Sequence, residues 1–389
     1  MPFIGNKPTS VPLTSSDITD GIITTTKIAD ANVTNPKLTS GSQQNFRNLI
    51  INGDMSQAQR STSVSSITSS SYNTVDRFRT TISTAGTWTQ SQSTDVPTGQ
   101  GFAKSLKMDC TTADGSLAAG DRLFIEQQVE GQNLQYLKKG TSSAESTTMS
   151  FWVKSNKTGT YICVLEDDNS RSISKSYTIS SADTWEKKTL TFAGDTSGAL
   201  DNDNTTGFRV EFWLASGSTY SSGTLNTSWN STTNANMAVG QVNLADSTSN
   251  DWYVTGIQLE AGTSASDFEF LPVDVNLDRC QRYYQALSNG YTITNLVFSC
   301  FDSTYAYGTH SFIKTMRTAP TINFNSLGSG NIQAYNNGAE RTLSSISASN
   351  ISKDRVSIDV AGSGWSGGQA LHLNNNNTSV PLFTASSEL

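Results

Sequence analysis

The sequence has little of what most enzymes and disulfide-bonded proteins depend on. Its 389 residues include only 2 His and 4 Cys, and only 15% of them are charged. No two of the cysteines have CxxC spacing and none has a neighbouring His, so we expect free, mostly buried thiols and no metal site. These cysteines are Cys110, Cys163, Cys280 and Cys300. Free thiols fit synthesis in a reducing cytoplasm.

Long hydrophobic runs and basic clusters are also missing. The longest apolar runs are a few residues, far shorter than a membrane span, and the first residues do not resemble a signal peptide. The net charge is −7, and no segment forms the basic stripe that phosphate binding needs. We therefore expect neither membrane insertion nor a nucleic-acid partner.

The residues that are abundant favour β-structure. Ser, Thr and Asn dominate, and the chain carries 16 Phe, 12 Tyr and 7 Trp. This composition is typical of all-β proteins with many turns, and the aromatic content argues against disorder.

Residues 1–43 contain a regular repeat of single aliphatic residues. A period of five suits neither one helical face nor one face of a flat strand. The segment therefore forms a small β-solenoid or lies extended against partner chains, because six isolated anchors cannot make a core. We predict that they serve attachment or trimerisation: Leu13, Ile18, Ile23, Ile28, Val33 and Leu38.

The stretch from Asp17 to Thr34 resembles the tails near the start of bacteriophage fibre proteins. That resemblance implies a virion-attachment end that associates as a trimer. A flexible linker that happens to repeat is the alternative, since Ser/Thr-rich tracts also form linkers.

Residues 45–272 alternate between short apolar segments and turn residues, a pattern that predicts a β-sandwich. The segments Asn48–Met55 and Trp252–Gly262 resemble the first and last strands of carbohydrate-binding-module jelly rolls, which implies that they pair in one domain. Other predicted strands include Leu123–Ile125, Met149–Val153, Tyr161–Leu165 and Phe208–Leu214.

A sugar site in this domain would need exposed aromatic rings with amide and hydroxyl partners. The candidates near the longest polar stretch are Trp213, Tyr220, Trp229 and Asn230. The alternative is that such aromatics belong to the core, as we expect for Trp152, Trp185 and Trp252. Two acidic clusters, Asp201–Asn204 and Glu166–Asn169, lack the spacing of a calcium loop and are interpreted as turns.

Residues 273–286 are predicted to form a short connecting helix. Leu277, Cys280 and Tyr284 fall on one helical face, and Asp274 or Asn276 is a possible cap. The string "CQRYYQ" resembles the helix that precedes the distal domain in many phage fibre and appendage proteins. Phe312–Thr321 and Ala385–Leu389 resemble further segments of those distal domains.

Residues 287–389 are predicted to form a small distal β domain. Its loops are rich in Asn, Tyr, Ser and Gly, a composition that suits recognition surfaces but also ordinary turns. We predict that a receptor is bound here, and we expect Trp365 to act in function or between subunits. The predicted receptor-binding residues are Tyr305, Tyr307, Tyr335, Trp365, Asn374, Asn375, Asn376 and Asn377.

Catalysis is not expected. The two histidines, His310 and His372, have no nucleophile motif nearby, and no zinc, phosphate-loop or dinucleotide motif is present. Paired carboxylates leave no sequence signature, so they are not excluded on sequence grounds. We expect no cofactor.

These patterns together predict an all-β, trimeric chain: an extended tail, a jelly-roll sandwich, a short helix and a distal β domain. The resemblance implies a virion fibre, made in the host cytoplasm. Its N-terminus would attach to tail or other virion proteins, and its C-terminal domain would bind a host glycan or protein. The alternatives are a capsid-bound fibre or decoration protein, and a tailspike depolymerase.

Overall fold

A computed structural model describes residues 46–287, 296–328, 331–375 and 380–389. Residues Phe46–Leu389 form one compact unit that is mostly β-structure. Within the described ranges, no helix is both long and apolar enough to cross a membrane. The six predicted tail anchors lie outside the described residues, as do Asn376 and Asn377.

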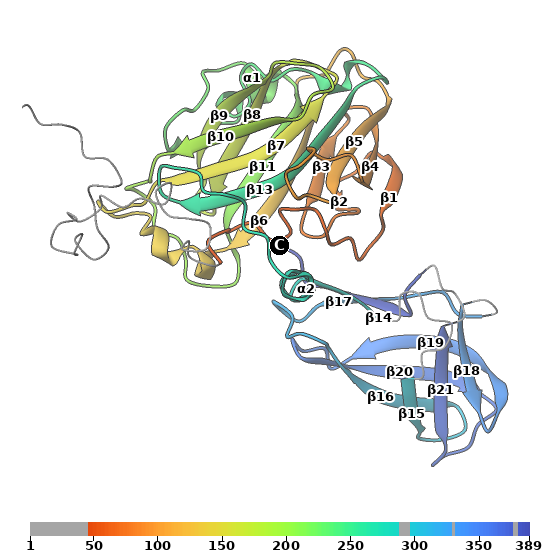
Figure 1. The fold of residues 1–389 in the computed structure, drawn as a ribbon. Coiled ribbons are helices and arrows are strands. Elements are labelled where there is room, and N and C mark those ends of the chain that lie inside the picture. The colour runs from red at the N-terminus through yellow and green to blue at the C-terminus, as the bar shows by residue number, and fades with distance from the viewer. Residues whose placement is uncertain (1–45, 288–295, 329–330, 376–379) are drawn as a thin grey trace, which may run out of the picture. The chain divides into compact units, whose positions relative to one another are not determined.

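The first part of this unit is a β-sandwich of two antiparallel sheets (Figure 1). In spatial order, the six-stranded sheet contains β1 (Ser63–Ile67), β4 (Thr87–Ser93), β5 (Ser105–Thr112), β13 (Asp251–Ala261), β7 (Thr147–Ser155) and β10 (Glu186–Phe192). The seven-stranded sheet contains β12 (Asn230–Ser231), β9 (Arg171–Ile179), β8 (Gly159–Asp167), β11 (Thr206–Ser216), β6 (Arg122–Glu130), β3 (Arg79–Ser83) and β2 (Ser71–Tyr72). The predicted sandwich is confirmed.

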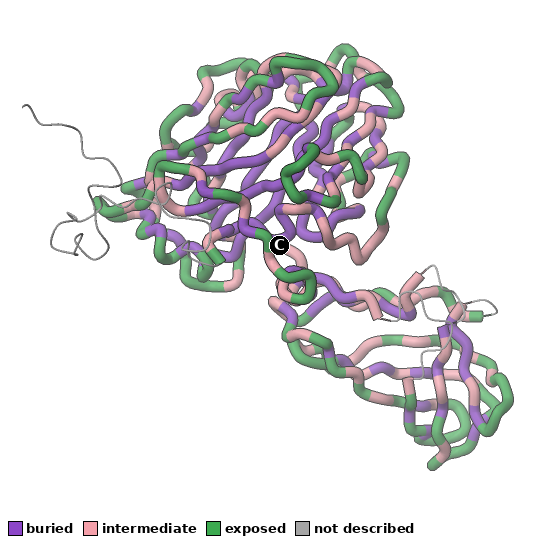
Figure 2. Tube along the Cα trace, in the orientation of Figure 1, coloured by how far each residue is buried: buried purple, intermediate pink, exposed green. Residues whose placement is uncertain are grey.

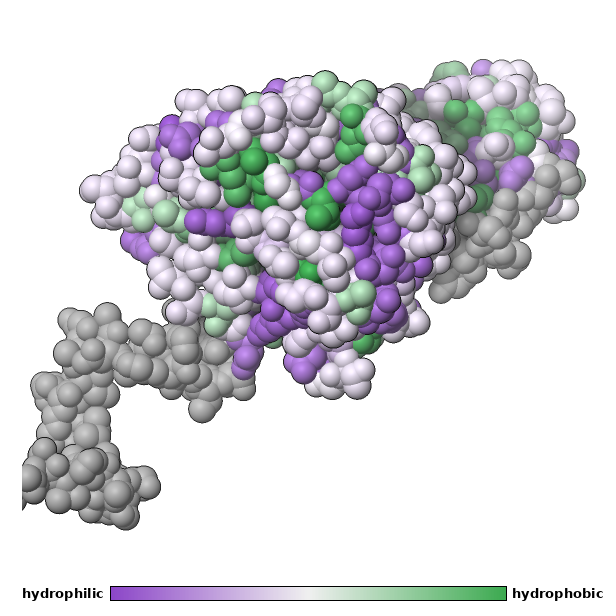
Figure 3. Space-filling view, turned by 90° about the horizontal axis from the view of Figure 1, so that it is seen from above, coloured by the Kyte–Doolittle hydropathy of each residue, from purple (hydrophilic) through white to green (hydrophobic). Residues whose placement is uncertain are grey.

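Alternation along the strands builds the core. In β11, Phe208, Val210 and Phe212 point into the sandwich, whereas the residues between them face outward. Phe212 and Tyr177 both meet Phe151 edge-on, with ring centroids 5.1 Å and 5.0 Å away. Figure 2 shows buried residues along the strands and exposed residues mainly in the connections. On the face seen in Figure 3, hydrophobic residues form only small separate patches.

The predicted opening strand is wrong in its secondary structure. Asn48–Met55 is a turn-rich segment with Asn52 and Met55 at positive φ, so it cannot form a regular ladder. It nevertheless lies beside β13: Leu49 N–H donates to Leu259 O at 2.9 Å, and Ile257 N–H donates to Gly53 O at 2.9 Å. The predicted proximity of the two segments is therefore observed without the predicted strand.

The predicted helix is shorter than expected. Helix α2 spans Val273–Gln281 and starts directly after Pro272, so neither Asp274 nor Asn276 caps it. Tyr284 begins strand β14 (Tyr284–Leu287) instead of extending the apolar face of the helix. The sandwich carries only one further α-helix, α1 (Ser218–Ser221), together with 3₁₀ turns at Gly131–Asn133, Gln135–Leu137, Asn234–Asn236 and Leu244–Asp246.

The C-terminal residues form a closed barrel and a small sheet. In spatial order, the barrel contains β15 (Leu296–Cys300), β16 (Tyr305–Ser311), β20 (Arg355–Ser363), β19 (Ala339–Ser349), β18 (Ile332–Asn336) and β21 (Ala370–Asn375). The sheet contains β14, β22 (Phe383–Ser386) and β17 (Thr321–Phe324). All four cysteines of the chain are free and buried, as expected.

The three strings that resemble phage distal domains meet where the sandwich joins the C-terminal part. Arg282 of "CQRYYQ" donates two hydrogen bonds, at 2.7 Å and 2.8 Å, to Glu130 of the sandwich. Arg317 donates to the backbone carbonyls of Ser387, Glu388 and Asn204. These strings therefore have a structural role in joining the two β-structures.

Candidate functional site

The outward face of the seven-stranded sheet carries a groove of about 290 Å³. The segment 217–242, which contains α1 and β12, covers part of this face. Tyr220, Leu225 and Met237 of that segment pack on an outward cluster that includes Trp213 and Phe124. Outward side chains of β3, β6 and β11 line the groove beside the covered part; Arg79 and Arg209 are half-buried, whereas Glu126 is buried.

Two of the predicted glycan residues, Trp213 and Tyr220, are brought together at one end of the groove. Their rings are 5.4 Å apart, and Phe124 lies 4.8 Å from Trp213. Trp213 is only 1% exposed, so Tyr220 is the ring that a ligand can reach. Arg122 fixes Tyr220 by donating to its hydroxyl at 3.0 Å and by lying over its ring.

Charged side chains form a row across the strands in the rest of the groove. Glu126 of β6 accepts from Arg79 of β3 at 2.8 Å and pairs with Arg209 of β11 at 3.1 Å. Arg209 also donates to Glu166 of β8 at 2.7 Å. The row exists because these residues occupy outward positions on neighbouring strands.

Glu211 lies opposite Glu126 in the strand register, at the junction of the charged row and the aromatic end. Burial raises the pKa of Glu211 well above its usual range, and the nearby Glu166 and Glu126 carboxylates raise it further. Its carboxyl group accepts a hydrogen bond from Trp213 Nε1 at 2.9 Å. Burial and the neighbouring carboxylates therefore both favour the neutral form of Glu211 over the charged form.

The groove presents chemistry that suits a hydroxyl-rich ligand. Arginine and glutamate side chains supply donors and acceptors, and Tyr220 supplies a ring face at one end. Across the described residues, no group of three or more His, Cys, Asp or Glu is arranged to hold a metal ion. Asp203 of the acidic cluster binds Thr205 two residues later, as a turn residue does.

The other two predicted glycan residues lie elsewhere. Trp229 stacks on Phe208, with ring centroids 5.8 Å apart, and its Nε1 donates to Ala193 O. Lys139 lies 5.0 Å from the Trp229 ring centre and pairs with Asp195 at 3.0 Å. Asn230 is exposed, and its amide nitrogen bonds to Asn226 and to Ser228. Neither residue lines the groove.

The predicted core tryptophans differ in burial. Trp252 is buried in the sandwich, as expected. Trp152 and Trp185 are only half-buried, because Trp152 occupies an outward position on β7 and Trp185 precedes β10. Trp185 donates to Asp95 at 2.9 Å and lies beside Lys154. The expectation that all three belong to the core is wrong for these two.

Several of the predicted receptor residues are part of the barrel's own packing. Trp365, which we expect to act in function or between subunits, is only 4% exposed and packs in the barrel core. Asn375 is buried and donates to Val380 O. Tyr335 and Asn374 are half-buried, and Tyr335 contacts Gln333 at 3.3 Å.

Tyr305 and Tyr307 lie at the barrel surface together with a residue that the sequence analysis missed. Tyr307 is 47% exposed and Phe301 is 70% exposed, with ring centroids 6.5 Å apart. Tyr305 is held more firmly, because its hydroxyl donates to Asp359. Phe301 directly follows the apolar strand β15, so the sequence alone suggests a buried core aromatic.

Comparisons with known proteins show distant structural similarity to carbohydrate-binding modules and to a phage tailspike domain. No family model and no curated protein matches the chain. The enzymatically active domain of tailspike protein 4 from bacteriophage CBA120 is 13% identical, with a TM-score of 0.29. That match covers 55% of this chain and 21% of the other, so the chain spans about a fifth of the length of the tailspike structure.

Two carbohydrate-binding modules give similar values. TmCBM61, solved in complex with β-1,4-galactotriose, is 10% identical, with 55% of this chain and 99% of that one covered and a TM-score of 0.29. The family 11 module from Clostridium thermocellum, solved in complex with a mixed-linked tetrasaccharide, is 12% identical, with 49% and 91% covered and a TM-score of 0.25. TM-scores of this size support no functional argument, so the function is inferred from the groove itself.

Proposed function

We propose that the chain is a glycan-binding structural component of a phage virion and that the groove beside Tyr220 binds a host surface saccharide. The observation that supports this most is the combination of one accessible, anchored tyrosine ring with the row of Arg and Glu side chains. Saccharides need an apolar ring face together with fixed hydrogen-bonding groups. Both are present within one groove.

Binding without cleavage is the form of this proposal that the electrostatics favour. Glu126 is engaged by Arg79 and Arg209, and Glu166 is engaged by Arg209. Glu211 is buried, and it accepts a hydrogen bond from Trp213. A glycosidase needs an acid and a base that reach either side of a glycosidic bond, and these pairings hold the carboxyl groups against the sheet.

Titration of the full chain with fragments of host surface polysaccharide tests the groove. Tyr220→Ala is expected to weaken binding by about tenfold, since stacking and the lost contact with Arg122 together correspond to roughly 1–2 kcal/mol. Ile313→Ala is the control, because it removes an exposed apolar side chain that does not line the groove. Unchanged affinity in Tyr220→Ala would refute the groove, and release of reducing sugar would refute binding without cleavage.

The barrel is a second candidate for contact with the host. The exposed rings of Phe301 and Tyr307 support it, because large apolar side chains are rarely left exposed side by side without a partner. In this proposal the N-terminal tail attaches a trimer to the virion, and the barrel and groove face the cell. Labelling of virions would distinguish a tail fibre from a capsid-bound fibre or decoration protein.

A further inference from the structure

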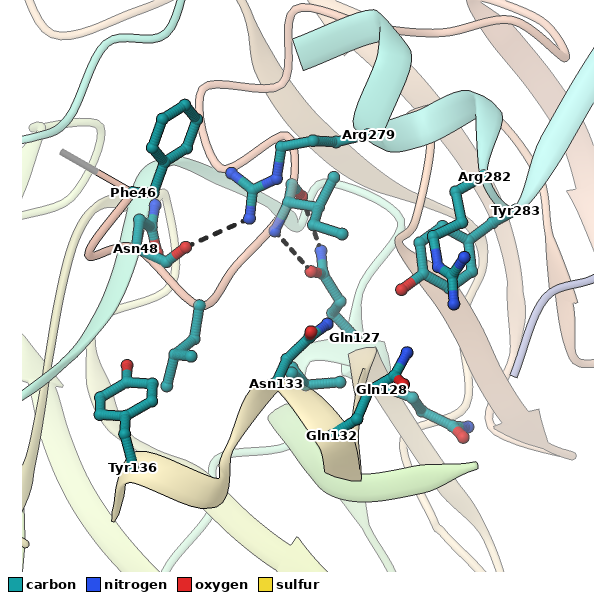
Figure 4. A pocket seen from close by; sticks show the side chains of 13 residues that line it. Phe46, Asn48, Gln127, Gln128, Gln132, Asn133, Tyr136, Arg279, Arg282 and Tyr283 are labelled. Atoms are coloured by element: carbon teal, nitrogen blue, oxygen red, sulfur yellow. Dashed lines mark hydrogen bonds between the residues drawn. The ribbon is translucent and has the colours of Figure 1, made fainter. Parts of the chain in front are cut away.

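A cavity between the end of β6 and helix α2 shares no lining residue with the groove. It has a volume of about 500 Å³. Its walls come from three places: the segment that starts at Phe46, the end of β6 with the turns that follow it, and helix α2 with the two residues after it (Figure 4). A cavity of this size accommodates one or two sugar residues.

The cavity has a positive lining in a chain whose net charge is −7. Its only charged lining residues are Arg279 and Arg282, and no Asp or Glu lines it. Arg282 is already neutralised by its two hydrogen bonds to Glu130. Arg279 is therefore the cation that is left to act on a ligand.

Arg279 makes a single long hydrogen bond. Its Nη2 donates to Asn48 O at 3.3 Å, and it forms no ion pair with the acids of the described ranges. The Glu269 carboxylate acts on Arg279 electrostatically, but its two oxygens accept from the backbone N–H groups of Phe46 and Asn48. Most of the guanidinium N–H groups of Arg279 remain available, in the planar arrangement that matches a carboxylate.

Two exposed aromatic rings and the side chain of Asn133 complete the cavity. Phe46 is 64% exposed and Tyr136 is 48% exposed, although both line it. Figure 4 shows Arg279 reaching from α2 toward Asn48, with Tyr136 and Asn133 on the opposite wall. The side chain of Gln127, by contrast, is committed to both backbone groups of Ile51, at 2.7 Å and 2.8 Å.

We propose that this cavity is a second saccharide site that takes a carboxylated sugar residue, a hexuronate, with the carboxylate on Arg279 and the sugar ring against Phe46 or Tyr136. The inference goes beyond the groove, where Arg79 and Arg209 are paired with glutamates and Arg122 is held by Tyr220. It also gives a role to Arg279, which immediately precedes the "CQRYYQ" string.

Ligand-observed NMR on the full chain, with glucuronate and galacturonate at millimolar concentration, tests the proposal. Glucose and galactose serve as the neutral counterparts. Both acids, or one of them, are expected to bind more tightly than the neutral sugar. Arg279→Gln is expected to weaken binding of the acid by about tenfold or more, because a charge-assisted hydrogen bond is lost, and to leave the weak binding of the neutral sugar unchanged.

The controls separate charge recognition from other effects. Arg355→Gln removes the same charge from an exposed site on the barrel and should change nothing. Phe46→Ala and Tyr136→Ala should weaken binding of acid and neutral sugars alike, since ring faces do not distinguish them. Higher salt should weaken only the acid.

The proposal is overturned if neither acid binds, if acid and neutral sugars bind equally, or if Arg279→Gln binds the acid as tightly as wild type. If Tyr220→Ala no longer binds the acid while Arg279→Gln still binds it, the acid binds in the groove. That outcome rejects the cavity while supporting the proposed function. If Tyr220→Ala binds the acid normally and Arg279→Gln does not, the cavity is supported, whether or not the groove binds a neutral saccharide.

Discussion

Arg77 and Glu388 form an ion pair between the sandwich and the penultimate residue of the chain. Arg77 is completely buried, and its guanidinium lies 3.4 Å from the centre of the Tyr283 ring. Burial alone would lower the pKa of Arg77, but Glu388 together with Tyr283, Tyr72 and Cys280 raises it above its usual range. Arg60 also binds Glu388, at 3.0 Å. The end of the chain is therefore part of the interior that joins the sandwich to the C-terminal strands.

Removing one partner of this pair should destabilise the protein strongly. Glu388→Gln is expected to lower the free energy of unfolding by about 3–5 kcal/mol, because it leaves a buried guanidinium without its counter-charge. Urea unfolding measures the change. Glu145→Gln is the control: its pair with Lys138 is solvent-exposed, so the loss should stay below about 1 kcal/mol. Equal losses of unfolding free energy in the two variants would show that the buried pair stabilises the protein no more than an exposed one.

The Asp76 carboxyl group should make stability fall as the pH rises. Burial raises its pKa to about 6 from 3.8, despite hydrogen bonds from Gln59 and the nearby Arg60. Between these two values the folded chain keeps a proton that the unfolded chain releases. The stabilisation that this proton gives the folded state is therefore fully present below the unfolded pKa of 3.8. It declines between pH 3.8 and about pH 6 and is lost above the folded pKa.

Comparison with Asp76→Asn isolates this effect, since other groups titrate in both proteins. Relative to the variant, wild type should lose ~3 kcal/mol of unfolding free energy between about pH 3 and pH 7, the amount that corresponds to a shift of roughly 2 pKa units. Urea unfolding at a series of pH values measures it. A difference between the two proteins that does not vary with pH would contradict the raised pKa.

Strands of the sandwich could be predicted from the sequence where several large apolar residues mark the strand. Met149–Val153 and Phe208–Leu214 carry several large apolar residues, and both lie in observed strands. Strand β9 was missed because Ser and Lys separate its buried Ile173, Tyr177 and Ile179, so that it resembles a polar loop. Asn48–Met55 was mistaken for a strand because burial of its aliphatic residues does not require strand geometry.

The candidate sites were harder to predict because they depend on long-range strand pairing. Trp213 and Tyr220 are seven residues apart and could be chosen together from the sequence. The row that joins Arg79, Glu126 and Arg209 arises only when β3, β6 and β11 become neighbours. Trp365 was misplaced for a related reason: its flanking glycines resemble a loop, but barrel closure buries its ring.

Removal of residues 1–43 should leave a folded protein that no longer enters virions. The described unit Phe46–Leu389 contains its own hydrophobic cores in the sandwich and the barrel, so it does not depend on the tail for burial. We expect unchanged circular dichroism, a change from trimer to monomer by light scattering, and no copurification with particles. Truncated protein that still copurifies with virions would place attachment elsewhere, and a monomeric full chain would refute the trimer.

Substitutions of buried and exposed aromatic residues in the barrel should affect stability and adsorption separately. Trp365→Ala is expected to lower the free energy of unfolding by about 3–5 kcal/mol, because it leaves a large cavity in the barrel core. Phe301→Ala combined with Tyr307→Ala should change stability by only about 0.5 kcal/mol, since both rings are exposed, yet reduce adsorption of the full chain to host cells. Thermal unfolding and a cell-binding assay measure the two effects.

Three copies of each surface in a trimer would amplify weak contacts, so the loss should be largest for whole fibres and smaller for any single site. If the double variant adsorbs as well as wild type while Tyr220→Ala does not, recognition of the host belongs to the sandwich groove, and the exposed rings of the barrel serve another contact.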